Sequence, residues 1–438
     1  MQMTHHECVL QMNIYLYLCI PTLFILAPCS VIKGSPDRTL KDSSVLFDIK
    51  ARLATDLSVW PNRTSYTNSD SWLIQHHDKI KVLKPRVLVI DFYNARPVAM
   101  CHEFVDKVIA AFGEGSRYHG YKDPFSRPQL MYMVTKYINL RDSSGKNISN
   151  KRPHHADGSF DEAGMFSDSF AQYMGYRDSS NTRYLRLGEL FDEGIINECW
   201  VIAPHTLYEA QGRVRKYDSA FHFTGQYNEC VNACYNFGDA GRRTSVTIRL
   251  GEINVDRGVG CATHAFGHAI ERMALGDIPY FGKVAERFFN FNLDKRYGAP
   301  FTEEYACPYY VTPPDCFCLT SHTIKTVNKH LPDWTFNNWG EGCGNIHFPV
   351  NAKFQYDYND PQPVLCTCEN YGLRNGTDGN DLQKTYTDAL VKDWNTGAYN
   401  DCGGEYIMYL RQNMPGYNSG ATGDDGKPMK SWWPFLFY

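Results

Sequence analysis

The stretch Arg86-Val-Leu-Val-Ile-Asp91 is a short, continuous apolar run, typical of a β-strand that is buried on both faces. Similar or alternating runs predict three more strands, at residues 130–140, 198–203 and 244–250. Apolar residues recur with helical spacing between and after them, over residues 101–112, 184–193 and 256–275. Strands that alternate with helices predict an α/β fold with a mainly parallel, doubly wound sheet.

The composition divides the chain into four parts. We expect residues 1–34 to be a signal peptide, because their apolar core is shorter than the ~20 residues of a membrane-spanning helix. An uncleaved interfacial anchor is the alternative. Residues 35–82 form a polar lead-in segment, and residues 83–276 form the α/β domain. Residues 277–438, rich in Cys, Pro, Gly and aromatic residues, are expected to form a disulfide-rich, loop-rich cap packed on that domain.

Cysteine usage favours a secreted, extracellular protein without a transmembrane span after signal removal. Three of the 15 cysteines lie in the predicted signal, and the remaining even number allows up to six disulfides. Cys316-Phe-Cys318 and Cys366-Thr-Cys368 could instead be halves of a zinc ribbon, but their one-residue spacing favours disulfides. Asn-x-Ser/Thr sequences predict possible N-glycans at Asn62, Asn147 and Asn375.

Charge and aromatic content narrow the class of partner. The net charge is −4 with both signs scattered along the chain, so nucleic acid is not an expected partner. Aromatic residues make up 14% of the chain, which suits a sugar-binding groove but also suits packing in a loop-rich secreted protein.

The octet His264-Ala-Phe-Gly-His268-Ala-Ile-Glu271 carries the strongest indication of chemistry. On a helix its two histidines and its glutamate lie on one face, within roughly a 60° arc, and zinc accepts both ligand types. The metallopeptidase motif H-E-x-x-H places a glutamate directly after the first histidine, and here that residue is Ala265. Because the helix is otherwise largely apolar, a buried structural His–Glu pair and a metal-free catalytic dyad remain alternatives.

A second cluster is the glycine-rich stretch Gly342-Cys-Gly-Asn-Ile-His347-Phe-Pro-Val-Asn351. Such a loop can bring a third imidazole to a metal site, with Asn345 and Asn351 orienting it. The alternative is a turn with a surface histidine. The pairs His76-His77 and His154-His155 lie in polar segments and are expected to be solvated.

The α/β fold places the octet near the carboxyl ends of the strands, where open parallel sheets bind ligands. Glu252 and Asp256 lie just before its helix, and Glu209 lies in a predicted loop after another strand. Each of the three is a candidate general base. Gly258 and Gly260 are similar to a dinucleotide-binding loop, but the third glycine is absent.

Several motifs together resemble those of a family of uncharacterised secreted proteins best represented in bacteria. The motifs are Asp256-Arg-Gly-Val-Gly260, Phe266-Gly-His268-x-x-Glu271, Cys343-Gly-Asn-x-His347-Phe-x-x-Asn351 and Trp432-Trp433. The resemblance runs from about Lys84 to the C-terminus. It implies one fold across most of the chain and assigns no activity to any residue.

The leading hypothesis is a secreted zinc-dependent hydrolase, possibly peptidase-like, acting on an extracellular peptide or glycan. His268 and Glu271 would be zinc ligands, with His264 or His347 as the third, and the pKa of a water in the open position would fall toward ~7. An H-x-x-E motif with a distant histidine is similar to the ligand pattern of metallocarboxypeptidases. The alternative is a non-enzymatic matrix, surface or carbohydrate-binding glycoprotein. A metal-free α/β hydrolase is disfavoured, because the chain lacks a G-x-S-x-G elbow.

Overall fold

The structure is a computed structural model, and it describes only part of the chain. The described residues are 55–65, 69–158, 160–202, 249–272, 274, 279–291, 317–319, 323–325, 334–335, 342–352, 356–374, 381–392 and 399–437. All of them belong to the compact unit Lys41–Tyr438, and the predicted signal peptide lies outside them. Within these ranges, the structure has no helix that is both long and apolar enough to cross a membrane.

Four parallel strands form the central sheet in the order β4-β3-β5-β6. The strands are β3 (Arg86–Asp91), β4 (Met133–Asn139), β5 (Glu198–Ile202) and β6 (Arg249–Ile253). The inner strands β3 and β5 are buried at every position, as their continuous apolar runs predict. The prediction of an α/β fold with a parallel sheet is therefore confirmed.

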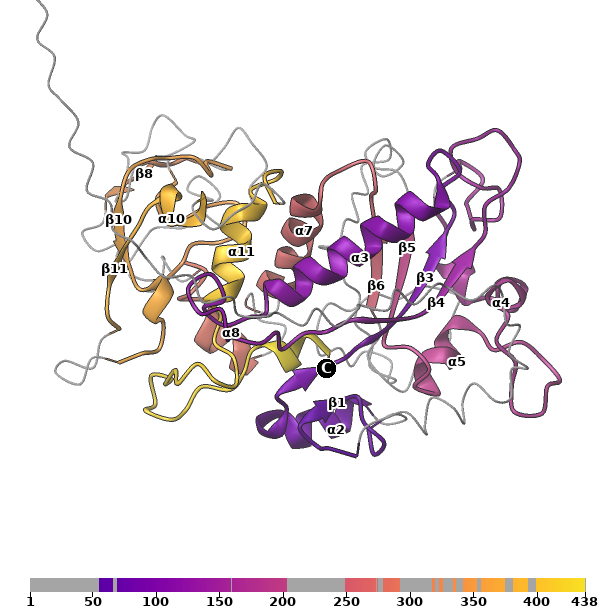
Figure 1. The fold of residues 1–438 in the computed structure, drawn as a ribbon, viewed down its shortest axis with the longest axis horizontal. Helices are drawn as coiled ribbons and strands as arrows, with labels where there is room; N and C mark the ends of the chain where they lie inside the picture. The colour runs from indigo at the N-terminus through magenta and orange to yellow at the C-terminus, as the bar shows by residue number, and fades with distance from the viewer. Residues whose placement is uncertain are drawn as a thin grey trace, which may run out of the picture. The chain divides into compact units, whose positions relative to one another are not determined.

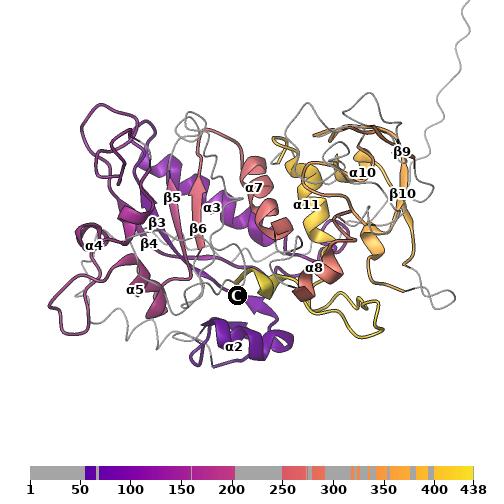
Figure 2. The ribbon, with the colours of Figure 1, turned by 180° about the vertical axis from the view of Figure 1, so that it is seen from behind.

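The sheet contributes side chains to two hydrophobic cores, because successive side chains of a strand point to opposite faces. Val87 and Val89 belong to the core that includes α3 (Val98–Glu114) and α7 (Val259–Arg272), and α3 crosses in front of the strands in Figure 1. Leu88 belongs to the other core, which includes α4 (Asp168–Met174) and α5 (Leu187–Asp192). From behind, in Figure 2, the strands lie in front of α3.

The first described segment packs against the C-terminal end of the chain. It contains β1 (Val59–Trp60), α2 (Ser69–His76), the 3-10 helix η1 (His77–Lys79) and β2 (Val82–Leu83), and β1 pairs with β2. The Trp60 ring lies 4.9 Å from that of Phe437, which ends the 3-10 helix η7 (Trp433–Phe437). The described residues of the predicted lead-in, 55–65 and 69–82, thus contribute to the core.

His77 corrects the expectation of a solvated histidine pair. Its side chain is buried, its Nε2 donates to the Ser431 carbonyl at 2.7 Å, and the Phe435 ring lies 4.4 Å away. Burial lowers the pKa of His77 to about 4. A polar local sequence did not reveal this burial, because the covering residues come from the other end of the chain. His154 and His155 are exposed, as expected.

The residues after α7 add helices and small antiparallel sheets. The helices are α8 (Pro279–Ala285), α10 (Asp388–Lys392), α11 (Gly404–Gln412) and the 3-10 helix η6 (Cys368–Asn370), and the strands are β7 (Phe317–Leu319), β8 (Thr323–Lys325), β9 (Trp334–Thr335), β10 (Val364–Cys366) and β11 (Lys384–Tyr386). Helix α11 packs beside α7, as Figures 1 and 2 both show.

A buried arginine joins these helices. Arg411 of α11 donates to the Phe112 carbonyl at 2.9 Å, and its guanidinium lies 4.8 Å from the Phe266 ring and 5.6 Å from the Trp433 ring. Burial lowers the pKa of Arg411 to about 9. Aromatic faces stabilise a desolvated cation, so this contact helps to fix α11 against α3 and α7.

The cysteines in the described part of the chain are only partly paired. Disulfides join Cys261 to Cys402 and Cys343 to Cys368, whereas buried free thiols are found at Cys101, Cys199 and Cys366. The six disulfides that the even count allowed are therefore not reached. Cys316-Phe-Cys318 lies outside the described side chains, and the disulfide of Cys368 argues against a zinc ribbon at Cys366-Thr-Cys368.

The predicted glycan sites differ in exposure. Asn147 is exposed, and Asn375 lies outside the described residues. Asn62 is fully buried, and its Nδ2 donates to the Val59 carbonyl at 2.9 Å. A glycan on this nitrogen does not fit the folded chain, so the prediction at Asn62 is wrong.

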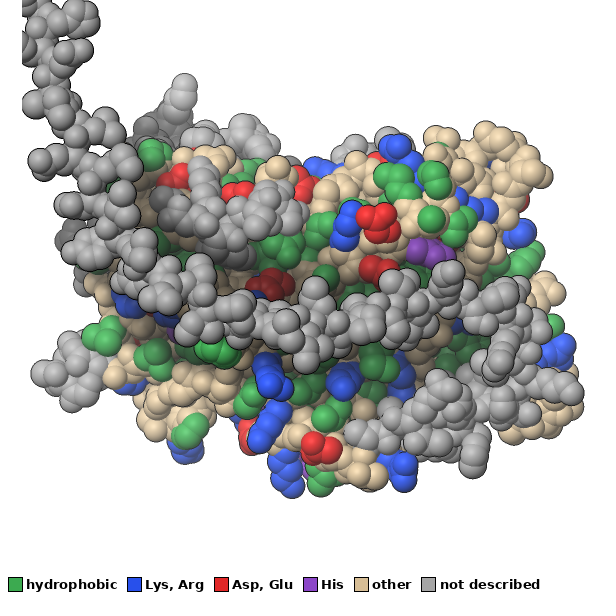
Figure 3. Space-filling model, viewed as in Figure 1, with side chains coloured by type: hydrophobic (Ala, Val, Ile, Leu, Met, Phe, Trp, Pro, Cys, Tyr) green, Lys and Arg blue, Asp and Glu red, His purple; other side chains and the backbone are tan. Residues whose placement is uncertain are grey.

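Charged side chains of both signs are interspersed on the face shown in Figure 3. Many of them pair, as Lys430 does with Asp78 at 3.0 Å. The scattered charges of the sequence thus remain scattered on this part of the folded surface.

Candidate metal centre

Helix α7 places two imidazoles side by side, as the octet predicts. His264 and His268 are four residues apart and lie on one face, with their Nε2 atoms 3.1 Å from each other. His268 is buried and His264 is half-buried. The opposite side of the helix, including Phe266 and Ile270, packs into the core. The apolar residues of α7 therefore anchor the helix, and its histidine face is left for other contacts.

Glu271 holds His268 in one orientation. Its Oε2 accepts from the Nδ1 of His268 at 2.8 Å, and its Oε1 accepts from the backbone N–H of Ile346. Both residues are buried. The Nδ1 of His268 therefore carries the proton that Glu271 accepts, and in the neutral ring the lone pair of Nε2 faces His264.

Glu271 was predicted to be a metal ligand, and the structure gives its carboxylate two partners within the chain. The groups that could hold an ion include His264, His268 and His347 but not Glu271. Its two oxygens are occupied by the imidazole and by the backbone amide. Such a carboxylate behind a ligating histidine fixes the ring and raises its basicity.

A backbone carbonyl fixes the orientation of the His264 ring, as Glu271 does for His268. The Nδ1 of His264 donates to the Cys402 carbonyl at 2.9 Å, which leaves its Nε2 without the proton in the neutral ring. The disulfide between Cys261 and Cys402 joins this carbonyl to the first turn of α7. The orientation of His264 thus depends on a residue 138 positions away.

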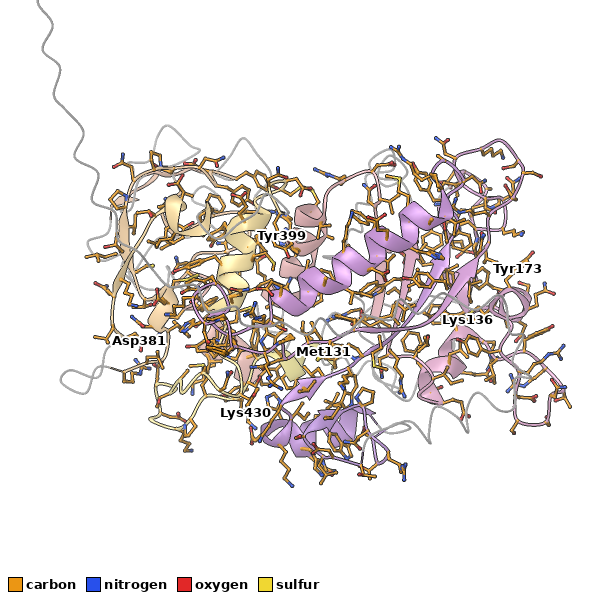
Figure 4. The ribbon with its side chains drawn as sticks, in the orientation of Figure 1. Met131, Lys136, Tyr173, Asp381, Tyr399 and Lys430 are labelled. Atoms are coloured by element: carbon orange, nitrogen blue, oxygen red, sulfur yellow. A yellow bond between two sulfur atoms is a disulfide. The ribbon has the colours of Figure 1, made fainter. Side chains whose placement is uncertain are left out.

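Glycines let the segment before α11 approach α7. A Cβ on Gly260 would lie 2.3 Å from the Asp401 carbonyl oxygen and 2.9 Å from that of Tyr399, which Figure 4 labels beside α7 and α11. A Cβ on Gly258 would meet the Asp401 carboxylate at 2.5 Å. Close packing against Asp401 and Tyr399 therefore explains Gly258 and Gly260, which the sequence likened to a dinucleotide-binding loop.

The third histidine comes from the loop of residues 342–352. Gly342 and Gly344 have positive φ angles of 78° and 84°, which glycine adopts readily. The disulfide from Cys343 to Cys368 fixes the start of the loop. The Oδ1 of Asn345 accepts from the backbone N–H of His347 and of Phe348, both at 3.1 Å. The glycines, the disulfide and the Asn345 hydrogen bonds therefore fix the loop in a tight turn.

Asn345 and Asn351 were expected to orient the ring of His347. Asn345 instead orders the backbone at His347, and Asn351 donates to the Asp360 carbonyl at 2.7 Å. Both side chains are buried. They stabilise the loop that carries the histidine through hydrogen bonds to backbone groups.

Ile346 brings the loop onto α7. A Cβ on Gly267 would lie 2.3 Å from the Cδ1 of Ile346, so this position of the helix has no room for a side chain. The Ile346 amide donates to Glu271, and the Tyr358 hydroxyl donates to the Ile346 carbonyl at 2.6 Å. Three contacts therefore fix the position of Ile346. The next residue, His347, lies against the face of α7 that carries His264 and His268.

Together, His264, His268 and His347 form what we call the histidine centre. Each offers one ring nitrogen, and these atoms all lie within 4.8 Å of one another. Two nitrogens bound to one tetrahedral zinc at about 2.0–2.1 Å lie about 3.3 Å apart. The 3.1 Å between the Nε2 atoms of His264 and His268 is close to this value. The donor set fits zinc with modest movement of His347.

The carboxylates predicted as general bases are placed elsewhere or lie outside the described residues. Glu252 shares a face of β6 with Leu250, whose core is on the side of the sheet away from α7. Asp256 accepts from the Tyr93 hydroxyl at 2.6 Å and from the Nε of Arg96 at 2.9 Å. Glu209 is not among the described residues.

A second group of possible ligands consists of Cys261, Asp401 and Cys402. The two sulfurs are bonded to each other in the structure. A metal needs thiolates, so this group is a disulfide and not a metal site in the oxidised protein.

Sequence reasoning missed Tyr356, whose ring centroid lies 4.5 Å from that of His347. Its hydroxyl lies 3.2 Å from the Nε2 of His347. Tyr358 and Cys402 were also missed as parts of this site. The only sequence signal was the position of both tyrosines shortly after His347, which is weak in a chain with 29 tyrosines.

Compared with known proteins, the chain matches no family model, no curated protein and no solved structure. The bacterial resemblance therefore stays a prediction, and the geometry of the histidine centre carries the functional argument.

Proposed function

We propose that this protein is a secreted, zinc-dependent hydrolase whose metal ion is held by His264, His268 and His347. One observation carries the proposal. The rings of His264 and His268 each donate from Nδ1 to an oxygen, and their Nε2 atoms face each other at 3.1 Å. Two lone pairs this close repel unless a cation lies between them, either a metal ion or a shared proton.

The third imidazole favours a metal ion over a shared proton. One proton satisfies two nitrogens, whereas a nitrogen of His347 also lies within 4.8 Å of both partners. Three imidazoles with an open fourth position are a known arrangement of catalytic zinc. Because all three ligands are neutral, the ion keeps its full positive charge.

The chain's own residues supply orientation and access. Glu271 and the Cys402 carbonyl fix two of the rings, so little rearrangement is needed for binding. His264 and His347 are half-buried and Tyr356 is exposed, so the centre lies near solvent on that side. A bound zinc ion would supply Lewis acidity and lower the pKa of water in its open position toward ~7.

We further propose that the sheet is doubly wound and that residues 277–438 form the cap that carries His347. The packing of α3 and α7 with one core and of α4 and α5 with the other supports the first part. The two disulfides that hold residues 342–352 and 399–404 support the second part and are compatible with secretion. Glu209 stays a predicted general base.

The test is metal analysis of the full chain, secreted from cells and loaded with zinc. We expect one zinc per chain in the parent and in the control His155→Ala, whose histidine is exposed. His268→Ala and His347→Ala should each lose stoichiometric zinc. The second variant is needed because His268 is buried and its replacement also removes a contact of the core.

Hydrolytic activity is the second measurement. Hydrolysis of a panel of peptides and glycans should disappear with a chelator and return with zinc. Equal zinc content in the parent and both variants would overturn the metal site. Stoichiometric zinc without hydrolysis of any substrate would favour the non-enzymatic extracellular protein.

A further inference from the structure

In the described part of the chain, two phenol hydroxyls lie near ring nitrogens of the histidine centre, and that of Tyr356 is nearer than that of Tyr358. Its Oη lies 3.2 Å from the Nε2 of His347, and its ring lies 6.2 Å from the His264 ring in a stacked arrangement. The side chain is 48% exposed. The phenol therefore lies at the solvent side of the centre, while His268 forms its buried side.

The backbone holds the phenol there against its conformational preference. Tyr356 has a φ of 66°, a left-handed conformation that a bulky side chain adopts rarely. Its N–H donates to the His347 carbonyl at 2.7 Å, and its own carbonyl accepts from Tyr358 at 2.9 Å. Strain of this kind persists where the surrounding structure enforces it, and it is concentrated at functional sites.

We propose that Tyr356 is the fourth protein ligand of the metal ion, through its phenol oxygen. This inference rests on the proposed function. Neighbouring ligand atoms of a tetrahedral zinc ion lie about 3.3 Å apart. The 3.2 Å between Tyr356 and His347 and the 3.1 Å between His264 and His268 both fit this separation.

The chemistry of the step is a proton exchange. The O–H bond of Tyr356 breaks, a bond from oxygen to the metal forms, and the proton passes to solvent, with no oxidation or reduction. Three neutral imidazoles and one phenolate leave one positive charge on the centre. In the resting protein the phenolate then occupies the fourth position, which opens when water or an oxygen of the substrate displaces the exposed phenolate and the phenolate takes up a proton from solvent.

Tyr358 is the matched comparison, because it is close to the centre but has a different role. Its hydroxyl donates to the Ile346 carbonyl at 2.6 Å and lies 3.5 Å from the Nδ1 of His264. That nitrogen already donates to Cys402 and cannot bind a metal in the same state. Tyr358 therefore holds the loop, and Tyr356 faces the ion.

The experiment uses the full chain loaded with copper(II), which three imidazoles bind at least as well as zinc. We expect a visible charge-transfer band from the phenolate to copper in the parent. Tyr356→Phe should bind one copper and lack the band, and Tyr358→Phe should keep it. Adding acetohydroxamate, a small oxygen-donor probe, should remove the band from the parent.

Proton release on zinc binding is the second measurement. Calorimetry in two buffers of different ionisation enthalpy should show about one more proton released by the parent than by Tyr356→Phe. Tyr356 would not be a ligand if the parent bound one copper per chain without the band, or if the two proteins released equal numbers of protons. The three-histidine site would stand in either case. A band that persists with acetohydroxamate would overturn displacement. Absence of metal binding in the parent would overturn both proposals.

Discussion

Two regions near helix α7 contain clustered polar side chains, and they differ in how those groups are satisfied. The first is a carboxyl-edge cluster at the ends of the sheet strands, made of Asp91, Tyr93, Arg96, Arg141 and Asp256. The second is the histidine centre. In the carboxyl-edge cluster every carboxylate has a cation, with Asp91 bound by Arg141 at 2.7 Å and Asp256 by Arg96 at 2.9 Å. The histidine centre has three imidazoles directed at one another.

The difference shows which cluster is a candidate for binding. Paired charges neutralise each other and stabilise the local fold, whereas imidazole nitrogens that converge on one point are stabilised by a bound cation. The two regions are also displaced along the chain. Val259 begins α7, and His268 lies nine residues later, about 14 Å along the helix axis at 1.5 Å per residue.

The largest expected effect is on the stability of the carboxyl-edge cluster. Asp91→Ala leaves the largely buried Arg141 without its carboxylate partner, and we expect a loss of about 3–5 kcal/mol in the free energy of unfolding. Zinc stoichiometry should not change. Urea denaturation and metal analysis measure the two effects. A loss of zinc at native stability would show that the two regions are one site.

A histidine outside both regions, His77, makes the stability of the folded chain decrease at acidic pH. The pKa of His77 is lowered to about 4 by burial, against 6.5 in the unfolded chain. As the pH falls below 6.5 the unfolded state takes up the proton first, so stability falls until about pH 4, by about 3 kcal/mol. Lys430 adds to the lowering of this pKa and Asp78 opposes it.

The variant His77→Gln should keep a donor for the Ser431 carbonyl and reduce this pH dependence. His119, whose pKa is also lowered to about 4 by burial, should retain part of it. Denaturant titrations at several pH values between 4 and 7 measure the slope. An unchanged slope in His77→Gln would contradict the assignment.

Glu271 and Asp256 offer a matched pair of carboxylates near the same helix. Glu271→Gln cannot accept from both His268 and the Ile346 amide, so zinc affinity should fall about 10–100-fold. Asp256→Asn should leave the affinity unchanged, because its partners are Tyr93 and Arg96. Competition with a chromophoric chelator gives both values. Equal losses would remove the distinction between the two regions.

The smallest expected effect is that of Gly267→Ala. Alanine favours a helix by about 1 kcal/mol over glycine, but its Cβ would lie 2.3 Å from Ile346, and such overpacking costs about 1–3 kcal/mol. We expect a small net loss of stability and weaker zinc binding, because His347 follows Ile346. Combining it with Ile346→Val, which removes the clashing methyl group, should recover stability in thermal denaturation. Additive losses would contradict the contact.

Local patterns predicted the secondary structure well where burial follows from short-range sequence. The strand at Arg86–Asp91 and the helix around the octet appear as expected, because their apolar spacing matches the core that covers them. The patterns failed where the partner is distant. His77 looked solvated until Ser431 and Phe435 covered it, and Glu271 looked like a ligand until the Ile346 amide occupied its other oxygen.

The sequence by itself determined that His264, His268 and Glu271 share one face of a helix, because the helical period depends only on spacing. It also indicated His347 as a possible partner. Only the tertiary structure decided which role each of these residues has in the site. Cys402, Ile346 and Tyr356 reach the same face through contacts between segments distant in sequence, and their positions depend on two disulfides, glycine contacts and a strained backbone. Such contacts arise from packing in three dimensions, which no local pattern of residues records.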